Sequence, residues 1–356
     1  MIIDGHVHVF PDQAGDGVGR PAAEHRRVMQ SAIKDYWGRM ITSHQDPRFI
    51  PEDNEDVDFH VAGCGRWRWH KHGEDCWLQR GPPVLAEMEH TPEQVVASMD
   101  AIGVDRGVIH ADFIYVDAVF GREHYFVECL RQYPDRLIGT FTINFDPNAD
   151  ERSRERELGA AKTAISNGFK ALYVEGNMPN PLDHPHCDPL WSCLVEHGIP
   201  AYINTGFCER DHYLAQVESL SRLLHRYPDL HVIDSHFGGN YLHERNPSHT
   251  NLDELDPLLK TGRFLFELGY VLAFEHQSVW GADAEYPYRR QVELAQKLHA
   301  RYGADVLTWG SDIPWCYRVC TYRQSLDSVR QHMPFLSASE MDKVLGGNLA
   351  RVLQIT

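Results

Sequence analysis

The sequence begins Met1-Ile-Ile-Asp-Gly-His6-Val-His8-Val-Phe10, an apolar run rich in β-branched residues that carries two histidines. Side chains two positions apart leave a β-strand on the same face, so the run predicts a buried strand with His6 and His8 side by side at its end. Neutral imidazole is a common ligand of zinc, iron and manganese. A single His-x-His pair is weak evidence for a metal site, and its meaning depends on what lies at the ends of later strands.

From Thr91 onward, helical patterns alternate with short apolar runs. Counting the first strand, eight runs are apolar on both faces, as buried parallel strands are. Eight alternations of strand and helix predict an α/β fold, namely one (β/α)8 TIM barrel over residues 1–356. The alternative is an open doubly wound sheet, but no glycine-rich phosphate loop follows the first strand.

The C-terminal ends of the strands of such a barrel meet at one mouth, so residues far apart in sequence come together there. Imidazoles, carboxylates and one amide occupy these predicted ends. They are His6 and His8 on the first strand, His110 on the second, Glu175 on the fourth, Asn204 on the fifth, His236 on the sixth, Glu267 on the seventh and Asp312 on the eighth. Residues of these types are the usual protein ligands of divalent metals.

Four segments make the sequence resemble the amidohydrolase superfamily. They are Asp4-Gly-His6-Val-His8, Asp234-Ser-His236-Phe-Gly-Gly239, Trp309-Gly-Ser-Asp312-Ile-Pro314 and Leu345-Gly-Gly-Asn348-Leu-Ala-Arg351. The chain is most similar to the amidohydrolase-related branch, which contains aminocarboxymuconate semialdehyde decarboxylase, resorcylate-type decarboxylases and several hydrolases. The resemblance covers the barrel but not a long segment after the first strand.

The resemblance implies that His6, His8 and Asp312 bind a divalent metal and that His236 lies beside the metal or the substrate. We expect Asp312 and His236 to be catalytic, with His236 also a candidate ligand. A cation held by two imidazoles and a carboxylate keeps open positions, lowers the pKa of bound water and polarises a substrate oxygen. Zinc is the expected ion, with manganese or iron as alternatives. Asp312 would otherwise only cap the helix that follows it.

Two positions depart from the decarboxylase pattern. The fifth strand usually ends in a histidine ligand in that branch, whereas here it ends in Asn204, a poor ligand for zinc or iron. The fourth strand ends in Glu175, where other branches have a carboxylate or a modified lysine that bridges two metals. A bridging Glu175 would create a two-metal site, with the missing imidazole supplied by the insertion, so one or two ions are expected. The alternative is that Glu175 only pairs with Arg or Lys at the mouth.

Three further residues are predicted to contact the substrate. His110 would meet an anionic substrate, although a histidine buried in the core is an equal alternative. Glu267 is flanked by apolar residues, and a buried carboxylate must be paired or functional. Asn204 is assigned to the substrate because an amide is a poor metal ligand.

The segment 11–89 is predicted to be an insertion or cap, since so long a loop in a compact protein usually has a function. It has little periodicity beyond a possible helix over 24–40. Its stretch 60–77 holds three histidines, His60, His70 and His72, two cysteines and three tryptophans. We expect a Trp-pinned cap there, with a second metal or extra ligands for the main site as the alternative. The tryptophans would line a pocket for a flat substrate or form the core of the insertion.

The composition favours a soluble enzyme of the cytoplasm. The formal net charge is −17, which argues against nucleic acid or an anionic membrane as a partner. No apolar stretch approaches the roughly 20 residues of a membrane span, and no signal peptide is recognisable. The eight cysteines are scattered without a CxxC pair, so a disulfide framework is not expected.

The leading hypothesis is a metal-dependent enzyme that decarboxylates or hydrolyses a small carboxylated or carbonyl compound. A second hypothesis is a two-metal iron or manganese hydroxylase on the same barrel, suggested by Glu175, Asn204 and the histidine-rich insertion. A third is a catalytically degenerate subunit that pairs with an active homologue. Homo-oligomers are expected, because barrels of this branch commonly dimerise.

Overall fold

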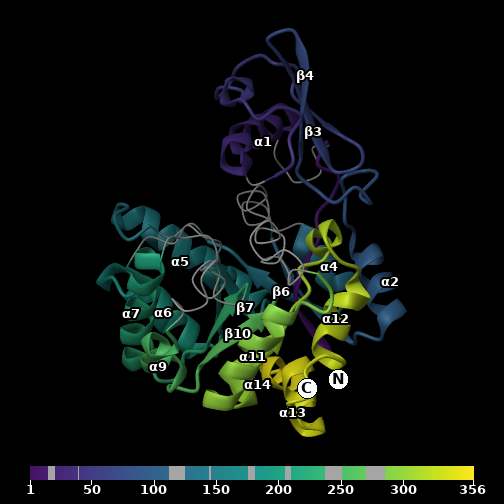
Figure 1. Cartoon of the computed structure of the whole chain (residues 1–356). Coiled ribbons are helices and arrows are strands. Elements are labelled where there is room, and N and C mark those ends of the chain that lie inside the picture. Colours follow the sequence, from purple (N-terminus) through teal and green to yellow (C-terminus); the bar gives the residue numbers. More distant parts are fainter. Residues whose placement is uncertain are drawn as a thin grey trace.

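Eight parallel strands form a nearly closed barrel in the computed structural model of the chain (Figure 1). The structure describes residues 1–14, 21–38, 40–111, 125–143, 146–174, 181–204, 210–236, 251–269 and 285–356. In order around the barrel, the strands are β1 (Ile3–His8), β5 (Arg106–His110), β6 (Leu137–Phe141), β7 (Ala171–Val174), β8 (Ala201–Asn204), β9 (Val232–Ser235), β10 (Phe264–Leu268) and β11 (Leu307–Trp309). The predicted (β/α)8 barrel is therefore confirmed.

The first and last strands meet through the residues that follow β11. A parallel bridge joins Val7 to Ile313, and the His8 amide donates to the Ile313 carbonyl at 2.8 Å. The loop after β11 thus closes the ring against β1, and the two sequence motifs at opposite ends of the chain become neighbours.

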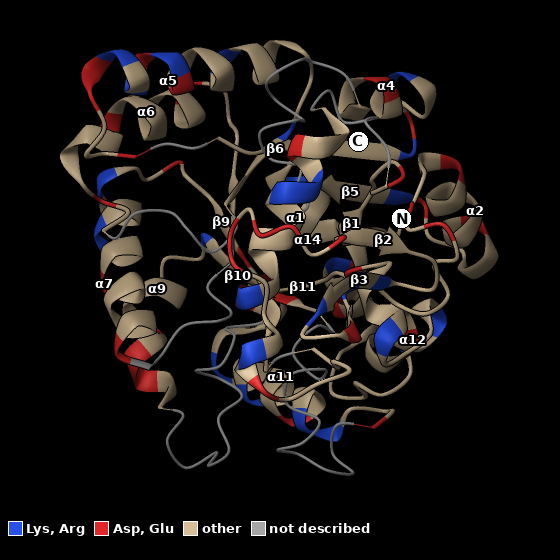
Figure 2. Ribbon diagram, turned by 90° about the horizontal axis from the view of Figure 1, so that it is seen from above, with Lys and Arg blue, Asp and Glu red and all other residues tan. Residues whose placement is uncertain are grey.

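Helices cover the outside of the barrel and carry many charged residues, whereas the barrel strands carry few (Figure 2). The main ones are α2 (Pro92–Ile102), α4 (Tyr125–Gln132), α5 (Glu151–Ser166), α6 (Asp188–Glu196), α7 (Arg210–Arg226), α9 (Asp256–Leu259), α11 (Arg289–Tyr302) and α12 (Tyr322–Arg330). Helix α2 begins as the sequence predicts, with a capping box between Thr91 and Gln94 and Pro92 in the first turn. Among the described residues, no helix is both long and apolar enough to cross a bilayer.

The C-terminal segment consists of three short helical pieces. They are α13 (Ala338–Asp342), a π-helical turn (Lys343–Gly347) and α14 (Asn348–Val352). The tail is interrupted at Gly346, where an added Cβ would lie only 2.5 Å from the carbonyl oxygen of Met1. This close approach brings the two ends of the chain together (Figure 1).

The segment after β1 stands above the barrel and is more regular than the sequence indicates (Figure 1). It contains α1 (Ala22–Tyr36), which ends before the predicted limit at residue 40, and a three-stranded antiparallel sheet. The strands are β2 (His60–Ala62), β3 (Arg66–Lys71) and β4 (Glu74–Gln79). The sequence indicated little periodicity here beyond one helix. That expectation is wrong, since short strands joined by tight turns form a sheet.

Local sequence explains this small sheet. In β3, Trp67 and Trp69 are buried while Arg66 and Arg68, which alternate with them, are only partly buried, which is the two-residue period of a half-buried strand. The turn to β4 consists of His72 and Gly73, both with positive φ, as a two-residue hairpin requires. Trp67 packs with Tyr36 and Phe59, so the tryptophans of β3 form the core of the insertion rather than a pocket wall.

Phe10 and His90 close the base of the insertion. Their backbones form an antiparallel bridge with N···O distances of 3.0 and 2.9 Å. The His90 Nδ1 also bonds the His8 carbonyl at 2.6 Å, and His90 is 3 % exposed. Burial lowers the pKa of His90 from 6.5 to about 4, although the hydrogen bond to His8 acts in the opposite direction.

We expect His90 to make the protein less stable in mild acid. Unfolded His90 takes up a proton near pH 6.5, but folded His90 does so only near pH 4, so lowering the pH through this window favours the unfolded state. Each unit of pKa difference corresponds to about 1.4 kcal/mol. Urea unfolding at pH 7.5, 6 and 5 should show a smaller loss of stability in His90→Gln than in the wild type. The exposed-site control His225→Gln should follow the wild type; equal pH slopes in all three proteins would contradict the prediction.

Candidate metal centre

Three ligand atoms from the two ends of the chain meet at the mouth of the barrel. His6 Nε2 lies 3.1 Å from His8 Nε2, and Asp312 Oδ1 lies 3.1 Å from His8 Nε2 and 3.6 Å from His6 Nε2. All three residues are buried, and together they form a group able to hold a metal ion. The structure thus brings together the three ligands that the sequence predicts.

The hydrogen bond of His8 fixes the tautomer of its neutral ring. His8 Nδ1 donates to the His110 carbonyl oxygen at 3.1 Å, because a carbonyl only accepts, so the neutral ring presents the lone pair of Nε2 to the site. A lone pair and a carboxylate oxygen repel each other unless something positive lies between them. Two imidazole nitrogens and a carboxylate oxygen at these distances form a binding site suited to a cation.

The outward nitrogens of both imidazoles are held by second partners. His6 Nδ1 lies 2.9 Å from Glu267 Oε1, and His8 Nδ1 is held by the His110 carbonyl. Partners of this kind fix the ring orientation and raise the basicity of a metal-binding histidine. The contacts of His6 with a carboxylate and of His8 with a carbonyl are therefore the arrangement expected around a cation.

Glu267 is completely buried beneath His6. Burial, together with the nearby Asp4 and Asp312, raises the pKa of its carboxyl well above the usual value, and burial among other histidines lowers the pKa of His6. Gly310 makes room for this carboxyl, since a Cβ there would lie 2.5 Å from Glu267 Cδ. The predicted contact of Glu267 with substrate stays a prediction; the contact that the structure shows is with His6.

A bulge in β1 sets the direction of His6. From Asp4 to Val7, β1 advances three residues, while its partner β5 advances two, from Gly107 to Ile109. Such an extra residue leaves backbone groups outside the ladder and re-aims a side chain. One of these groups, the Gly5 carbonyl, accepts from His110 Nε2 at 2.9 Å.

His110 thus supports the bulge from inside the barrel. It is fully buried, and its other ring nitrogen lies 3.1 Å from Thr140 Oγ1. Burial lowers the pKa of His110 well below 6.5, so the ring is neutral. Its predicted role as a substrate contact stays untested, while both of its nitrogens have protein partners.

His236 and Asp312 both adopt a left-handed backbone conformation at the ends of their strands, with φ of 66° and 58°. This region is uncommon for residues other than glycine, and residues held there cluster at functional sites. The Asp312 amide donates to the His6 carbonyl at 2.9 Å, which holds the residue in this turn.

The His236 ring lies beside His6, with the ring centroids 4.9 Å apart. Burial lowers the pKa of His236 to about 4, while the nearby Asp312 acts in the opposite direction. A neutral imidazole at this position is able to accept a proton at neutral pH. His6, His236 and Glu267 also form a second group of possible metal ligands, which shares His6 with the first.

Glu175 lies outside the described residues, and so does the side chain of Asn204, whose backbone forms the last residue of β8. The possible bridge between two metals therefore stays a prediction.

The histidines of the insertion are not brought together. His60, His70 and His72 are exposed and bond, respectively, the Asp58 carbonyl, Asp75 and the Arg48 carbonyl. Throughout the described part of the chain, only the two groups at the barrel mouth gather three possible ligands. The insertion instead reaches the site through an aromatic contact: the Arg80 guanidinium lies 4.3 Å from the ring centre of Trp315, whose ring is 6.1 Å from that of His8.

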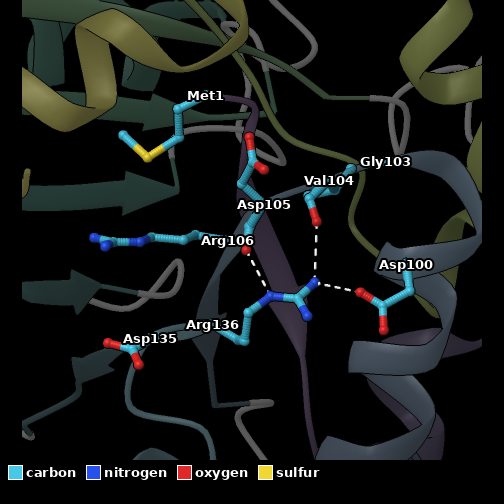
Figure 3. Close-up of a pocket in the computed structure, with 8 residues that line it drawn as sticks. All are labelled: Met1, Asp100, Gly103, Val104, Asp105, Arg106, Asp135 and Arg136. Atoms are coloured by element: carbon cyan, nitrogen blue, oxygen red, sulfur yellow. Dashed lines mark hydrogen bonds and ion pairs between the residues drawn. The ribbon is translucent and has the colours of Figure 1, made fainter.

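A hollow of about 760 Å³ lies at the opposite end of the barrel, where the strands begin (Figure 3). Arg136, on its wall, is already bound to Asp100 at 2.7 Å and to the carbonyls of Val104 and Asp105. Active sites of TIM barrels lie at the C-terminal ends of the strands, so this hollow is not the candidate site.

Sequence reasoning gave no role to Asp4, Ser311, His90 or Trp315. Asp4 is completely buried, and burial raises the pKa of its carboxyl to about 6 against the effect of hydrogen bonds from Ser311 and His6. An aspartate inside an apolar strand was a signal, because a buried carboxyl requires partners. The other three show their contacts only in the folded chain.

Comparisons with known proteins agree with this geometry. No curated protein sequence matches the chain. An amidohydrolase from Burkholderia multivorans is 13% identical, with a TM-score of 0.63 and 100% of both chains covered. The 4-oxalomesaconate hydratase from Rhodopseudomonas palustris is 17% identical, with a TM-score of 0.56 and coverage of 99% of this chain and 96% of that one. The 2,6-dihydroxybenzoate decarboxylase from Rhizobium is 14% identical, with a TM-score of 0.52 and coverage of 75% of this chain and 89% of that one.

These structural similarities concern the fold, since all three identities are low. The sequence profile described as Amidohydrolase matches residues 3–355, which is nearly the whole chain. The match includes the first and the last strand of the barrel and therefore the segments that carry His6, His8 and Asp312. The chain belongs to the amidohydrolase family.

Proposed function

We propose that the chain is a metal-dependent enzyme that hydrolyses or decarboxylates a small carboxylated or carbonyl compound. The observation that carries the proposal is the convergence of His6 Nε2, His8 Nε2 and Asp312 Oδ1 within 3.6 Å of one another in a buried site. Two imidazoles and a carboxylate suit zinc, manganese and iron, with zinc the expected ion. A divalent cation bound there would supply Lewis-acid activation of a substrate oxygen.

The exposed edges of the site indicate from which side a substrate would enter. His8, Asp312 and His236 retain 4 %, 2 % and 5 % exposure, whereas His6, His110 and Glu267 retain none. The first three residues would therefore face the substrate. His6 would be a fully buried ligand, and His110 and Glu267 would hold the ligands in position.

Asp312 and His236 are the groups placed to move protons. In hydrolysis, one of them would take the proton of the attacking water and pass it to the leaving group. In decarboxylation, one of them would protonate the carbon that loses carbon dioxide. Such proton transfers typically accelerate a reaction by about 10²–10⁴-fold.

A second candidate is oxygen activation by two metals. The group His6, His236 and Glu267 favours it, because these three ligand atoms lie within 4.8 Å of one another. That group shares His6 with the first, so a second cation would require a ligand such as Glu175 from outside the described residues. Elemental analysis separates the candidates: two iron or manganese ions per chain with substrate-dependent oxygen uptake would favour oxygenation, and zinc alone would oppose it.

The proposal is tested by metal-reconstituted turnover. Metal-free protein should be assayed with Zn²⁺, Mn²⁺ or Fe²⁺ on aromatic carboxylic acids for carbon dioxide release, and on lactones and amides for hydrolysis. A partner role without catalysis would instead show no metal-dependent turnover alone and co-purification with a homologous chain.

We expect His8→Ala to lose the metal. Removing the imidazole eliminates one of the three donors and leaves the Asp312 carboxylate without its contact at 3.1 Å. Elemental analysis of protein purified without added metal checks this, with His72→Ala in the exposed hairpin turn as the control that keeps full occupancy. Full occupancy in His8→Ala would defeat the assignment.

We expect Asp312→Asn to lower kcat by about 10²-fold or more, because the amide neither takes up a proton nor balances a cation. Steady-state kinetics on whichever substrate is turned over would measure the change. The control is Asp135→Asn, an exposed carboxylate at the opposite end of the barrel (Figure 3). Equal kcat values for the two variants would show that Asp312 has no role in the reaction.

A further inference from the structure

Asp4 receives hydrogen bonds from both ends of the chain. Its Oδ1 accepts from the His6 amide at 3.1 Å and from the Ser311 amide at 2.8 Å, and its Oδ2 accepts from the Ser311 hydroxyl at 2.5 Å. One buried carboxyl therefore joins β1 to a segment 307 residues away. The residues held in this way are His6 itself and the immediate neighbour of Asp312.

On the β1 side, Asp4 stabilises the bulge. Its acceptance of the His6 amide satisfies a donor that the bulge removes from the ladder. The Gly5 and His6 carbonyls of the bulge accept from His110 Nε2 and from the Asp312 amide, both at 2.9 Å. Asp4 therefore supplies one of the three contacts that set the direction of the His6 ring.

On the other side, Asp4 holds the turn that carries Asp312. The Ser311 hydroxyl donates to Asp4 and accepts from the Ile313 amide at 3.1 Å, so it fixes the residues on both sides of Asp312. Asp312 has a φ of 58°, a conformation that the surrounding contacts must maintain.

We propose that Asp4 is a positioning residue for the metal centre, which sets the separation of His6 and Asp312 without touching the cation. The inference rests on the proposed function, since it requires a cation at this site. Its physical basis is that a single carboxylate fixes the backbone at His6 and beside Asp312, two of the three proposed ligands.

Asp4→Asn is the sharpest variant. The amide has nearly the same shape and its oxygen still serves the His6 and Ser311 amides, but its NH2 group faces the Ser311 hydroxyl. That hydroxyl must then turn to accept, and its proton has the His6 carbonyl at 3.3 Å as the alternative acceptor. Replacing partners of metal ligands typically weakens metal affinity by about 10- to 100-fold, which is the expected loss here.

Ser311→Ala is the second variant, and it keeps the Asp4 charge. It removes only the hydroxyl, so it should weaken binding in the same direction but less, because the Ser311 amide still donates to Asp4. If Asp4→Asn fails to fold, Ser311→Ala still tests whether Asp4 positions the metal centre.

Asp183→Asn is the matched control. Asp183 likewise accepts from a serine hydroxyl, that of Ser219 at 2.6 Å, and it pairs with Arg222 in the helical layer. Loss of the Asp183 carboxylate should lower the midpoint of urea unfolding while leaving metal affinity unchanged. The comparison separates positioning from general destabilisation.

The measurements are the dissociation constants of Zn²⁺ and Co²⁺ and the visible spectrum of bound Co²⁺, under conditions where each variant is fully folded. Weaker binding and an altered Co²⁺ spectrum in Asp4→Asn and Ser311→Ala, but not in Asp183→Asn, would support the inference. Unchanged affinity and spectrum in the first two variants, or an equal loss in all three, would overturn this inference and leave the proposed function unaffected. Failure of the wild type to bind either ion would instead overturn the proposed function, and this inference with it.

Discussion

His8 Nε2 and Asp312 Oδ1 face each other at 3.1 Å inside the barrel. A neutral imidazole nitrogen and a carboxylate oxygen repel at this distance unless a proton or cation lies between them, and burial strengthens the repulsion because the dielectric constant is low. The chain therefore has to hold them in place by other means. The closed barrel, the bulge in β1 and the left-handed turn at Asp312 all contribute to this restraint.

Buried carboxyls surround the same point. Asp4, Glu267 and Asp312 retain at most 2 % exposure, and burial, followed by proximity to the other two, raises the pKa of Glu267. A divalent cation would relieve this concentration of negative charge, because its attraction is felt by all three in a medium of low dielectric constant. The same charges would cost stability in a protein that had no cation to bind there.

The insertion is linked to the site by stacked rings rather than by ligands. Its base is closed by Phe10 and His90, and Arg80 contacts Trp315, which also stacks on Phe10 with centroids 5.3 Å apart. Trp315 lies beside His8, so the packing of the insertion and the position of a ligand depend on one aromatic side chain. An insertion connected in this way is able to shape access to the site without providing a metal ligand.

The sequence predicted the barrel because buried parallel strands are apolar on both faces, and that pattern repeats eight times. It also predicted His6, His8 and Asp312 as neighbours, since parallel strands end at a common mouth and the motifs resemble those of amidohydrolases. The antiparallel sheet of the insertion was missed, although β3 alternates tryptophan with arginine. Its strands are no shorter than those of the barrel, but they do not alternate with helices, and that alternation is what indicated the barrel strands.

The sequence by itself determined which residue types are available at the ends of the strands. Only the tertiary structure decided that Glu267 supports His6, that His110 supports the bulge and that Asp4 joins the two ends of the chain. The physical reason is that residue type and period report burial and strand face, which are local properties. Hydrogen bonds across a closed barrel depend on register, and one extra residue in β1 changes that register without leaving a mark in the hydrophobic pattern.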